Sequence, residues 1–307
     1  MSDAKKELRS VKVGLHLSGK YFTYEIDAVT FQLQEACDFT WLSKLGTVFK
    51  VFDQQDSGNL SFGVEKEEQK YFVKFAGARP LTFDGNPLDA VSRLIEAIPL
   101  YNELESKSLI NLVSHFEVGT GYAAVFEWFA GECLHSHWLF TGEAKLNHPE
   151  SPFYRYKQLS VEKRLASLEV IFSFHEHVEL QGYVAVDFYD GSILYDFAND
   201  ETKICDIDFF RRKPTVNDVG ENFWGSTRFK SPEEFILGAP IDEVTNVFNM
   251  GATAFVLLGG ASDRSFAKWE ASQALYDVAL QAVSPEREQR YQNVEEFKIA
   301  WDRAGIV

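Results

Sequence analysis

The chain has 307 residues, of which 45% are hydrophobic and 27 are phenylalanine. This apolar content is enough for one large domain or two lobes, and it excludes a disordered chain. The formal net charge of −16 repels nucleic acids and anionic membrane surfaces. We therefore expect neither as a partner, and a phosphate-bearing ligand would need a local basic patch or a metal.

Three cysteines, Cys37, Cys133 and Cys205, are widely spaced and form no paired motif. This pattern favours a reducing compartment and argues against a structural zinc site. The first ten residues are charged and lack an apolar secretory run, and the longest apolar stretch, 248–260, is too short to span a bilayer. A cytoplasmic protein is expected.

The N-terminal residues show no pattern that points to chemistry. Residues 11–27 alternate as a strand does, and the segment from Ala28 to Cys37 predicts a short helix. We interpret residues 1–40 as an N-terminal extension.

Three strand candidates follow at 47–52, 60–65 and 71–75, and they predict a β-meander. The polar turn between the first two contains Gly58, which would let backbone N–H groups approach a phosphate closely. An ordinary hairpin explains the same pattern. In the third strand Lys74 stands among apolar residues, where an ammonium group needs an anionic partner.

Residues 88–104 have helical spacing, with Pro99 expected to kink or end the helix. Glu96 on this helix is the expected partner of Lys74, and a solvated Glu96 is the alternative. An apolar strand then runs from Tyr122 into a glycine-containing turn.

The stretch from Gly182 to Phe210 holds two apolar runs that meet at a polar turn, which predicts a hairpin. Asp187 and Asp206 stand beside apolar residues in these runs. A buried, unpaired carboxylate costs several kcal/mol, so we expect both to face a cleft or a cation. This layout suits a metal and phosphate site, although a surface hairpin with solvated acids is an alternative.

The spacing of Asp187 and Asp206 resembles that of the catalytic loop and metal-binding segment of protein kinases. The segment from Gly225 to Glu233 resembles the one that ends in Ala-Pro-Glu in these enzymes, and Arg290 lies in a segment like their last motif. The resemblance covers roughly residues 41–301.

The resemblance implies a role for each candidate residue. Asp187 would orient the acceptor hydroxyl and Asp206 would bind magnesium, since phosphoryl transfer depends mainly on positioning and charge. The remaining implied roles are the following: Lys74 and Glu96 at the phosphates, Gly58 in the phosphate-covering loop, Phe126 beside adenine, the backbone of Glu127 to Phe129 at the adenine edge, Ser226 in support of the catalytic aspartate, and Arg290 as the partner of Glu233.

The chain departs from the protein-kinase pattern around Asp187. Ala185 and Val186 replace the usual His-Arg, and Tyr189 replaces a lysine. At the metal site Ser192 replaces an asparagine, and Asp208, which replaces a glycine, would compensate as a second carboxylate ligand on the same face of an extended strand.

We therefore predict an α+β, two-lobed protein-kinase-like fold, with a small β-rich lobe at 41–130 and a larger, mostly helical lobe at 131–307. The predicted function is ATP- and Mg²⁺-dependent transfer of a phosphoryl group, foremost to a Ser or Thr hydroxyl of a protein. Three alternatives remain open: a kinase of a small molecule such as an antibiotic or sugar alcohol, a pseudokinase that binds partners without turnover, and a non-kinase scaffold.

Overall fold

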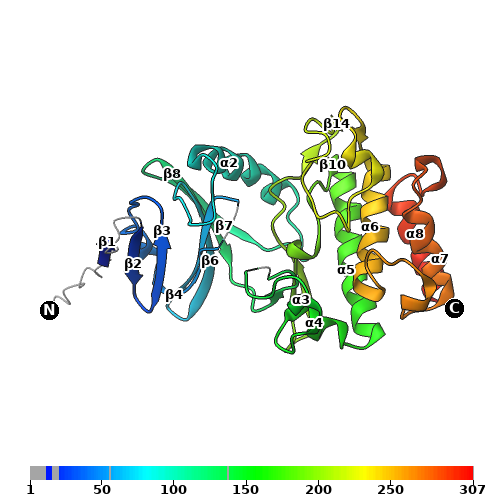
Figure 1. The fold of residues 1–307 in the computed structure, drawn as a ribbon, viewed down its shortest axis with the longest axis horizontal. Coiled ribbons are helices and arrows are strands. Elements are labelled where there is room, and N and C mark those ends of the chain that lie inside the picture. Colours follow the sequence, from blue (N-terminus) through cyan, green and yellow to red (C-terminus); the bar gives the residue numbers. More distant parts are fainter. Residues whose placement is uncertain (1–11, 16–20, 55–56, 137, 307) are drawn as a thin grey trace. The chain divides into compact units, whose positions relative to one another are not determined.

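The computed structural model describes residues 12–15, 21–54, 57–136 and 138–306 (Figure 1). It contains 36% helix and 24% strand, which confirms the predicted mixture of the two. The described residues divide into two compact units, one within 1–102 and 111–129 and the other within 103–110 and 130–307.

The first unit contains a five-stranded antiparallel sheet in the order β4-β5-β6-β8-β7 and a three-stranded sheet in the order β1-β2-β3. Its strands are β1 Lys12–Leu15, β2 Phe22–Ile26, β3 Val29–Leu33, β4 Thr47–Phe52, β5 Asn59–Lys66, β6 Gln69–Ala76, β7 Leu112–Val118 and β8 Gly121–Glu127. Its helices are α1 Leu42–Leu45 and α2 Pro87–Glu103. The predicted meander is confirmed by β4, β5 and β6.

Aromatic rings join the two sheets of the first unit into one core. The ring of Phe31 lies 5.2 Å from that of Tyr24 and 5.6 Å from that of Phe62 in the central sheet. Phe39 lies 5.9 Å from Phe75. Because these rings belong to a single buried cluster, residues from 22 onward form part of the first unit's core.

The helix predicted from Ala28 to Cys37 is wrong, since β3 occupies half of this range and the described structure has no helix in it. Ile26 pairs with Val29, so β2 and β3 are joined by a two-residue turn in which Asp27 has a φ of 51°. The Asp27 side chain accepts a hydrogen bond of 2.7 Å from the amide of Val48. The turn and the β-branched Val29 and Thr30 favour a strand over a helix.

Helix α2 continues through Pro99, so of the two expected effects, a kink or an end of the helix, the end is wrong. A proline frees the carbonyl group four residues earlier, here that of Ile95. Both Ile95 and Pro99 are exposed, so water can satisfy that carbonyl. On its buried side α2 packs against β8, where the rings of Tyr101 and Phe126 lie 4.8 Å apart.

The second unit is mostly helical. Its helices are α3 Ala144–Asn147, α4 Pro152–Lys157, α5 Val161–Leu180, α6 Glu243–Leu258, α7 Gln273–Ala282 and α8 Val294–Gly305, with short 3₁₀ turns at Asp190–Ser192, Pro232–Phe235, Phe266–Lys268 and Arg287–Gln289. Its strands are β9 Glu132–Cys133, β10 Tyr183–Val184, β11 Ile193–Asp196, β12 Glu201–Ile204, β13 Arg211–Arg212, β14 Thr215–Val216 and β15 Pro240–Ile241. The predicted hairpin is confirmed by β11 and β12, which pair antiparallel.

Helix α6 is the buried centre of the second unit. Every residue from Thr245 to Leu258 is buried, and α6 packs against α5, α7 and α8 (Figure 1). A Cβ atom on Gly251 would lie 2.7 Å from Cβ of Ala282, so glycine allows α6 and α7 to approach closely.

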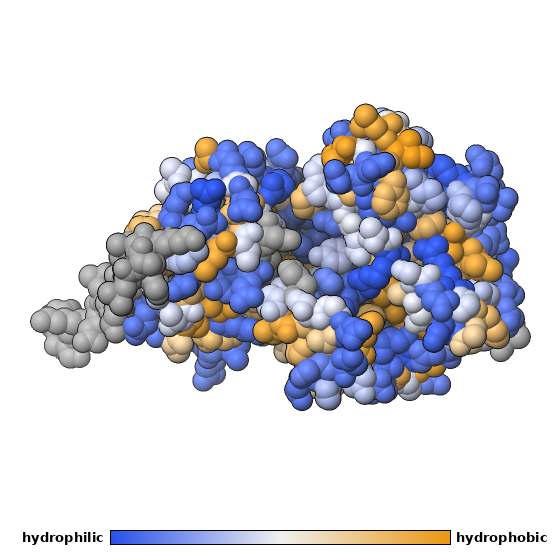
Figure 2. Space-filling view, in the orientation of Figure 1, coloured by the Kyte–Doolittle hydropathy of each residue, from blue (hydrophilic) through white to orange (hydrophobic). Residues whose placement is uncertain are grey.

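The surface of the second unit carries a patch of exposed apolar side chains near β14 (Figure 2). It consists of Val216, Val219, Phe235, Ile236 and Leu237. Among the described residues, none of the helices is both long enough and apolar enough to span a membrane.

Candidate active site

Asp187 lies in the loop after β10, and α6 fixes the backbone of this loop. The amide of Ala185 donates to Oδ1 of Asn246 over 3.0 Å, and Nδ2 of Asn249 donates to the carbonyl of Phe188 over 3.0 Å. Asp187 is half-buried and has a φ of 64°. A residue other than glycine in this left-handed region costs about 1–3 kcal/mol of conformational free energy, and the conformation persists only where the surrounding structure imposes it.

The hairpin of β11 and β12 places Ser192 beside Asp206. The amide of Cys205 donates to the carbonyl of Ser192 over 2.9 Å, and Asp206 follows directly. Asp206 is exposed and has a φ of 55°, while its neighbour Ile207 is fully buried. The buried side chain anchors the segment, and the carboxylate of Asp206 reaches solvent.

The expected extended strand from Asp206 to Asp208 is wrong. Strand β12 ends at Ile204, Asp206 has left-handed backbone geometry, and Asp208 is a half-buried residue in the turn that follows. The alternation of faces along a strand therefore does not apply to these two acids. A shared role of Asp206 and Asp208 at magnesium stays a prediction.

Ser192 has a feature that fits a cation site. Its side chain is fully buried, and within the described residues its Oγ atom has no hydrogen-bond partner. The described part of the chain contains no group of three or more His, Cys, Asp or Glu side chains that could hold a metal. Magnesium commonly takes one or two carboxylates together with substrate phosphates and water, and the donors here fit that pattern.

Tyr189 connects the acids of this region. Burial raises the pKa of its phenol, and the negative charges of Asp206, Asp187 and Asp190 raise this pKa further. A Cβ atom on Gly191 would overlap the ring and hydroxyl of Tyr189, so glycine lets this side chain pack directly against the backbone. The phenol therefore stays protonated near neutral pH and can donate a hydrogen bond from its O–H group.

Ser226 is held near Asp187 by its neighbour Gly225. A Cβ atom on Gly225 would lie 3.7 Å from Cα of Asp187 and 3.3 Å from Cγ of Lys230. Gly225 has a φ of 115°, which also favours glycine. Nζ of Lys230 donates to the carbonyl of Phe223 over 2.6 Å. The start of the segment that contains Ser226 is thus packed against the Asp187 loop.

A buried carboxylate close to Asp187 was not foreseen from the sequence. Asp190 is fully buried and accepts hydrogen bonds from Arg228 over 2.9 and 3.0 Å and from Nζ of Lys145. Nδ1 of His135 lies 3.7 Å from it. Burial alone would raise the pKa of Asp190, but Lys145 and Arg228 outweigh burial and hold it below its usual value. Asp190 is therefore ionised at neutral pH.

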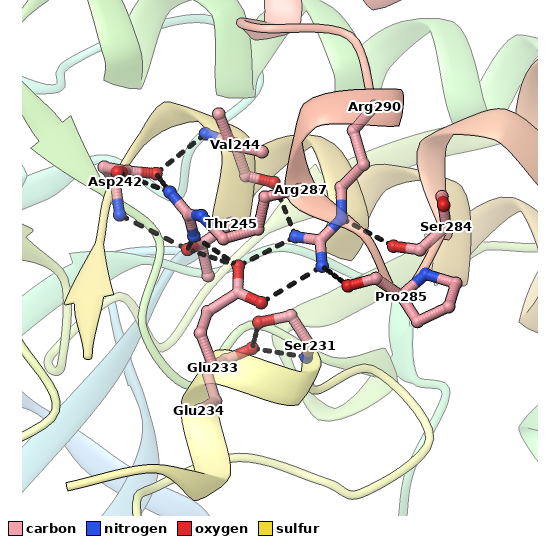
Figure 3. Close-up of polar contacts among 10 residues, drawn as sticks. All are labelled: Ser231, Glu233, Glu234, Asp242, Val244, Thr245, Ser284, Pro285, Arg287 and Arg290. Carbon is pink, nitrogen blue, oxygen red and sulfur yellow. Dashed lines mark hydrogen bonds and ion pairs between the residues drawn. The ribbon is translucent and has the colours of Figure 1, made fainter.

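The predicted pair of Glu233 and Arg290 is confirmed (Figure 3). Their side chains are buried and make two hydrogen bonds, of 2.8 and 3.1 Å. Arg287 adds a bond of 2.7 Å to Glu233 and binds Asp242 over 2.6 and 2.7 Å. Burial would raise the pKa of Glu233, but the hydrogen bonds from Arg290 lower it overall. Sequence reasoning missed Arg287.

The residues predicted at the phosphates lie in the first unit. Lys74 is buried in β6, where it pairs with Ser61 on one side and Ala124 on the other. Glu96 is exposed on α2 and forms no ion pair within the described residues, so the predicted pair with Lys74 is not made in this structure. Gly58 has a φ of 82°, and a Cβ atom there would lie 2.7 Å from the ring of Phe83.

The predicted adenine-binding stretch lies at the end of β8 and in the two residues after it. Phe126 is buried, and the amides of Glu127 and Trp128 donate to the carbonyls of Asn111 and Lys70 over 3.0 and 3.2 Å. Within the described residues, the amide of Phe129 has no hydrogen-bond acceptor. Of these amides, that of Phe129 is therefore the one available to a ligand.

The structure thus brings Asp187, Asp206, Ser192 and Ser226 together in the second unit, with Asp208 in the next turn. No family model matches this chain, and the search of curated proteins gives no match.

Proposed function

We propose that the chain is an ATP- and magnesium-dependent phosphotransferase with a two-lobed protein-kinase-like fold, acting on a Ser or Thr hydroxyl of a protein. One observation carries the proposal: Asp187 and Asp206, which both have a positive φ, lie close enough to Tyr189 for both charges to raise the pKa of its phenol. Phosphoryl transfer needs one carboxylate for the acceptor and another for the cation, at fixed positions.

Asp187 is the residue that accepts the hydrogen bond of the attacking hydroxyl. A fixed carboxylate can orient that hydroxyl and take its proton as the bond to phosphorus forms. The bonds from Asn246 and Asn249 to its loop restrict the loop's movement. Ser226, held close by Gly225, supports Asp187 in this proposal.

Asp206 and Ser192, with Asp208 as a further ligand, would hold magnesium. The cation supplies positive charge that offsets the charge on the transferring phosphoryl group. The unpartnered, buried Oγ of Ser192 supports this assignment.

Lys74, Gly58, Phe126 and the backbone of Glu127 to Phe129 form the proposed ATP site. Lys74 places an ammonium group within a β-sheet, where an anionic phosphate is a suitable partner. The available amide of Phe129 supports recognition of the adenine edge.

The test is ATP turnover with magnesium, measured against protein substrates and small-molecule hydroxyl acceptors in parallel. Lys74→Ala, Asp187→Asn and Asp206→Asn should each reduce transfer by about 100-fold or more, since each acts on the transferring group. The matched control is Asp277→Asn, at an exposed position on α7, and it should keep full activity. Near wild-type turnover of any of the three site variants would overturn the assignment, and transfer to small molecules alone would replace the protein acceptor.

A further inference from the structure

The cluster around Asp190 contains more positive charge than its own carboxylate needs. Lys145 and Arg228 both contact Asp190, and His135 lies next to them, with its Nδ1 at 2.6 Å from Nζ of Lys145. One buried carboxylate is neutralised by one cation. Keeping a second cation largely out of water costs free energy, so its presence needs another explanation.

Arg228 has donors left over after binding Asp190. It uses one N–H group on each terminal nitrogen for the two bonds to that carboxylate. Its Nε–H group and its two other N–H groups form no hydrogen bond within the described residues, and its guanidinium lies 5.3 Å from the centre of the Phe229 ring. A quarter of its side chain is exposed to solvent. Lys145, by contrast, is 9% exposed and directs its ammonium group to His135, Asp190 and the ring of Phe153.

Arg228 belongs to the segment that packs against the loop of Asp187, the residue proposed to orient the acceptor. It follows Gly225 by three residues in a turn closed by the bond of 2.8 Å from the amide of Phe229 to the carbonyl of Ser226. Gly225 in turn packs on the backbone of Asp187. Asp190 itself is three residues after Asp187. An acceptor oriented by Asp187 would therefore lie at the loop that also carries Asp190, the residue that binds Arg228.

We propose that Arg228, fixed by Asp190 and backed by Lys145, binds an oxyanion of the acceptor next to the hydroxyl that is phosphorylated. This inference rests on the proposed phosphotransferase function and names its substrate class, which is an acidic peptide segment. A guanidinium whose orientation is already fixed by one carboxylate loses little freedom when it binds another carboxylate or a phosphate through its remaining N–H groups. In a chain with a net charge of −16, a local cation is also needed to bind such a group.

The first experiment does not depend on catalysis. The affinity of the protein for inorganic phosphate is measured by calorimetry at constant ionic strength for wild type, Arg228→Gln, Arg228→Lys and the control Arg303→Gln, which changes an exposed arginine on α8. Arg228→Gln should weaken phosphate binding by about 10- to 100-fold, the usual range for charge-assisted hydrogen bonds, and the control should not. If Arg228→Gln does not fold, Arg228→Lys is used. It keeps a positive charge beside Asp190 but loses the planar set of N–H donors, so it should still weaken phosphate binding. Equal phosphate binding by wild type and the folded Arg228 variants overturns the site.

The second experiment tests the acceptor. Peptides with one serine carry Glu, phosphoserine or Gln at each neighbouring position in turn, and kcat/KM is measured for each. An acidic neighbour should raise kcat/KM by about 10-fold or more in wild type and in Arg303→Gln, but not in Arg228→Gln. The Glu and phosphoserine peptides show which oxyanion is preferred. Equal use of acidic and neutral peptides by wild type overturns the inference, whereas Arg228-dependent phosphate binding without transfer to any acceptor keeps the site and overturns the phosphotransferase proposal.

Discussion

The two carboxylates that matter most in the proposed mechanism, Asp187 and Asp206, share an uncommon backbone geometry. Each has a positive φ, and each is next to a deeply buried side chain, Phe188 or Ile207. The buried neighbours impose this geometry on both residues, and at Asp187 the bonds from α6 add to this restraint. In each loop a fixed backbone thus carries a carboxylate that is not itself buried.

Glu234 is a single residue that should make the stability of the fold depend on pH. It is almost fully buried, and burial raises its pKa from 4.5 to about 7, although hydrogen bonds from the amide and Oγ of Ser231 oppose this shift. Because the folded-state pKa is above the unfolded one, the unfolded protein binds fewer protons between these values, and stability falls as pH rises from about 5 to 7. Glu234→Gln keeps an oxygen acceptor for Ser231 without the charge.

We expect Glu234→Gln to raise the free energy of unfolding at pH 8 by about 1–3 kcal/mol, with little difference from wild type near pH 4.5. Urea unfolding at the two pH values measures this change. A pH-independent difference would show that Glu234 is not the titrating group.

At the scale of elements, the segment between Phe210 and Gly225 is held by its own side chains. Arg211 binds Asp218 over 3.0 Å and lies over the rings of Phe223 and Trp224. Asn217 is fully buried, and its side chain bonds the amide and the carbonyl of Gly220. These contacts give the segment a defined conformation without a phosphate group.

We therefore expect activity without phosphorylation of this segment. Val186, in the loop of Asp187, occupies the position where the protein-kinase resemblance implies an arginine that binds such a phosphate. Thr215→Ala should keep wild-type turnover. Mass spectrometry establishes the phosphorylation state of each preparation. An unphosphorylated protein that becomes active only after Thr215 is modified would contradict the prediction.

The link between the 3₁₀ turn at Pro232–Phe235 and the segment before α8 depends on Glu233 and Arg290. Arg290→Ala would leave the buried carboxylate with only part of its compensation, from Arg287, and should cost about 3–5 kcal/mol of stability. Thermal unfolding measures the effect, with Arg303→Ala on α8 as the control. An unchanged melting curve for Arg290→Ala would contradict the buried pair.

Sequence reasoning succeeded where a local pattern or a known motif carried the signal, and it failed where distant segments meet without a motif. The bounds of β4 follow from six residues of strand pattern, and the Glu233–Arg290 pair followed from a known motif. The contacts of Asp190 with Lys145 and Arg228 join residues 45 and 38 positions apart, and no local pattern predicts them. The wrong helix at residues 28–37 has a local cause instead. Apolar spacing alone does not reveal the two-residue turn that begins at Asp27.

At the scale of the whole molecule, strands β2 and β3 belong to the first unit, because their aromatic residues lie in its core. The ring of Phe31 lies between those of Tyr24, Phe39 and Phe62, at 5.2 to 5.6 Å from each. An extension that merely precedes a domain would not share a core with its central sheet. Residues 22–41 therefore contribute to the stability of the first unit.

Phe31→Ala should lower the free energy of unfolding by about 3–5 kcal/mol, the usual cost of removing a buried phenylalanine ring. The control Val113→Ala removes an exposed side chain on β7 and should change stability by less than about 0.5 kcal/mol. Both are measured by urea unfolding. A small effect of Phe31→Ala would show that the N-terminal strands are dispensable.

The network around Glu233 also has a consequence for synthesis of the chain on the ribosome. Glu233 and Arg290 are 57 positions apart, and translation adds about 5–20 residues per second. The carboxylate is thus made about 3–11 s before the guanidinium that compensates it inside the fold. During this interval the segment around Glu233 cannot bury its charge against Arg290. The last quarter of the chain must therefore be translated before the segment beside the proposed acceptor site can reach its final structure.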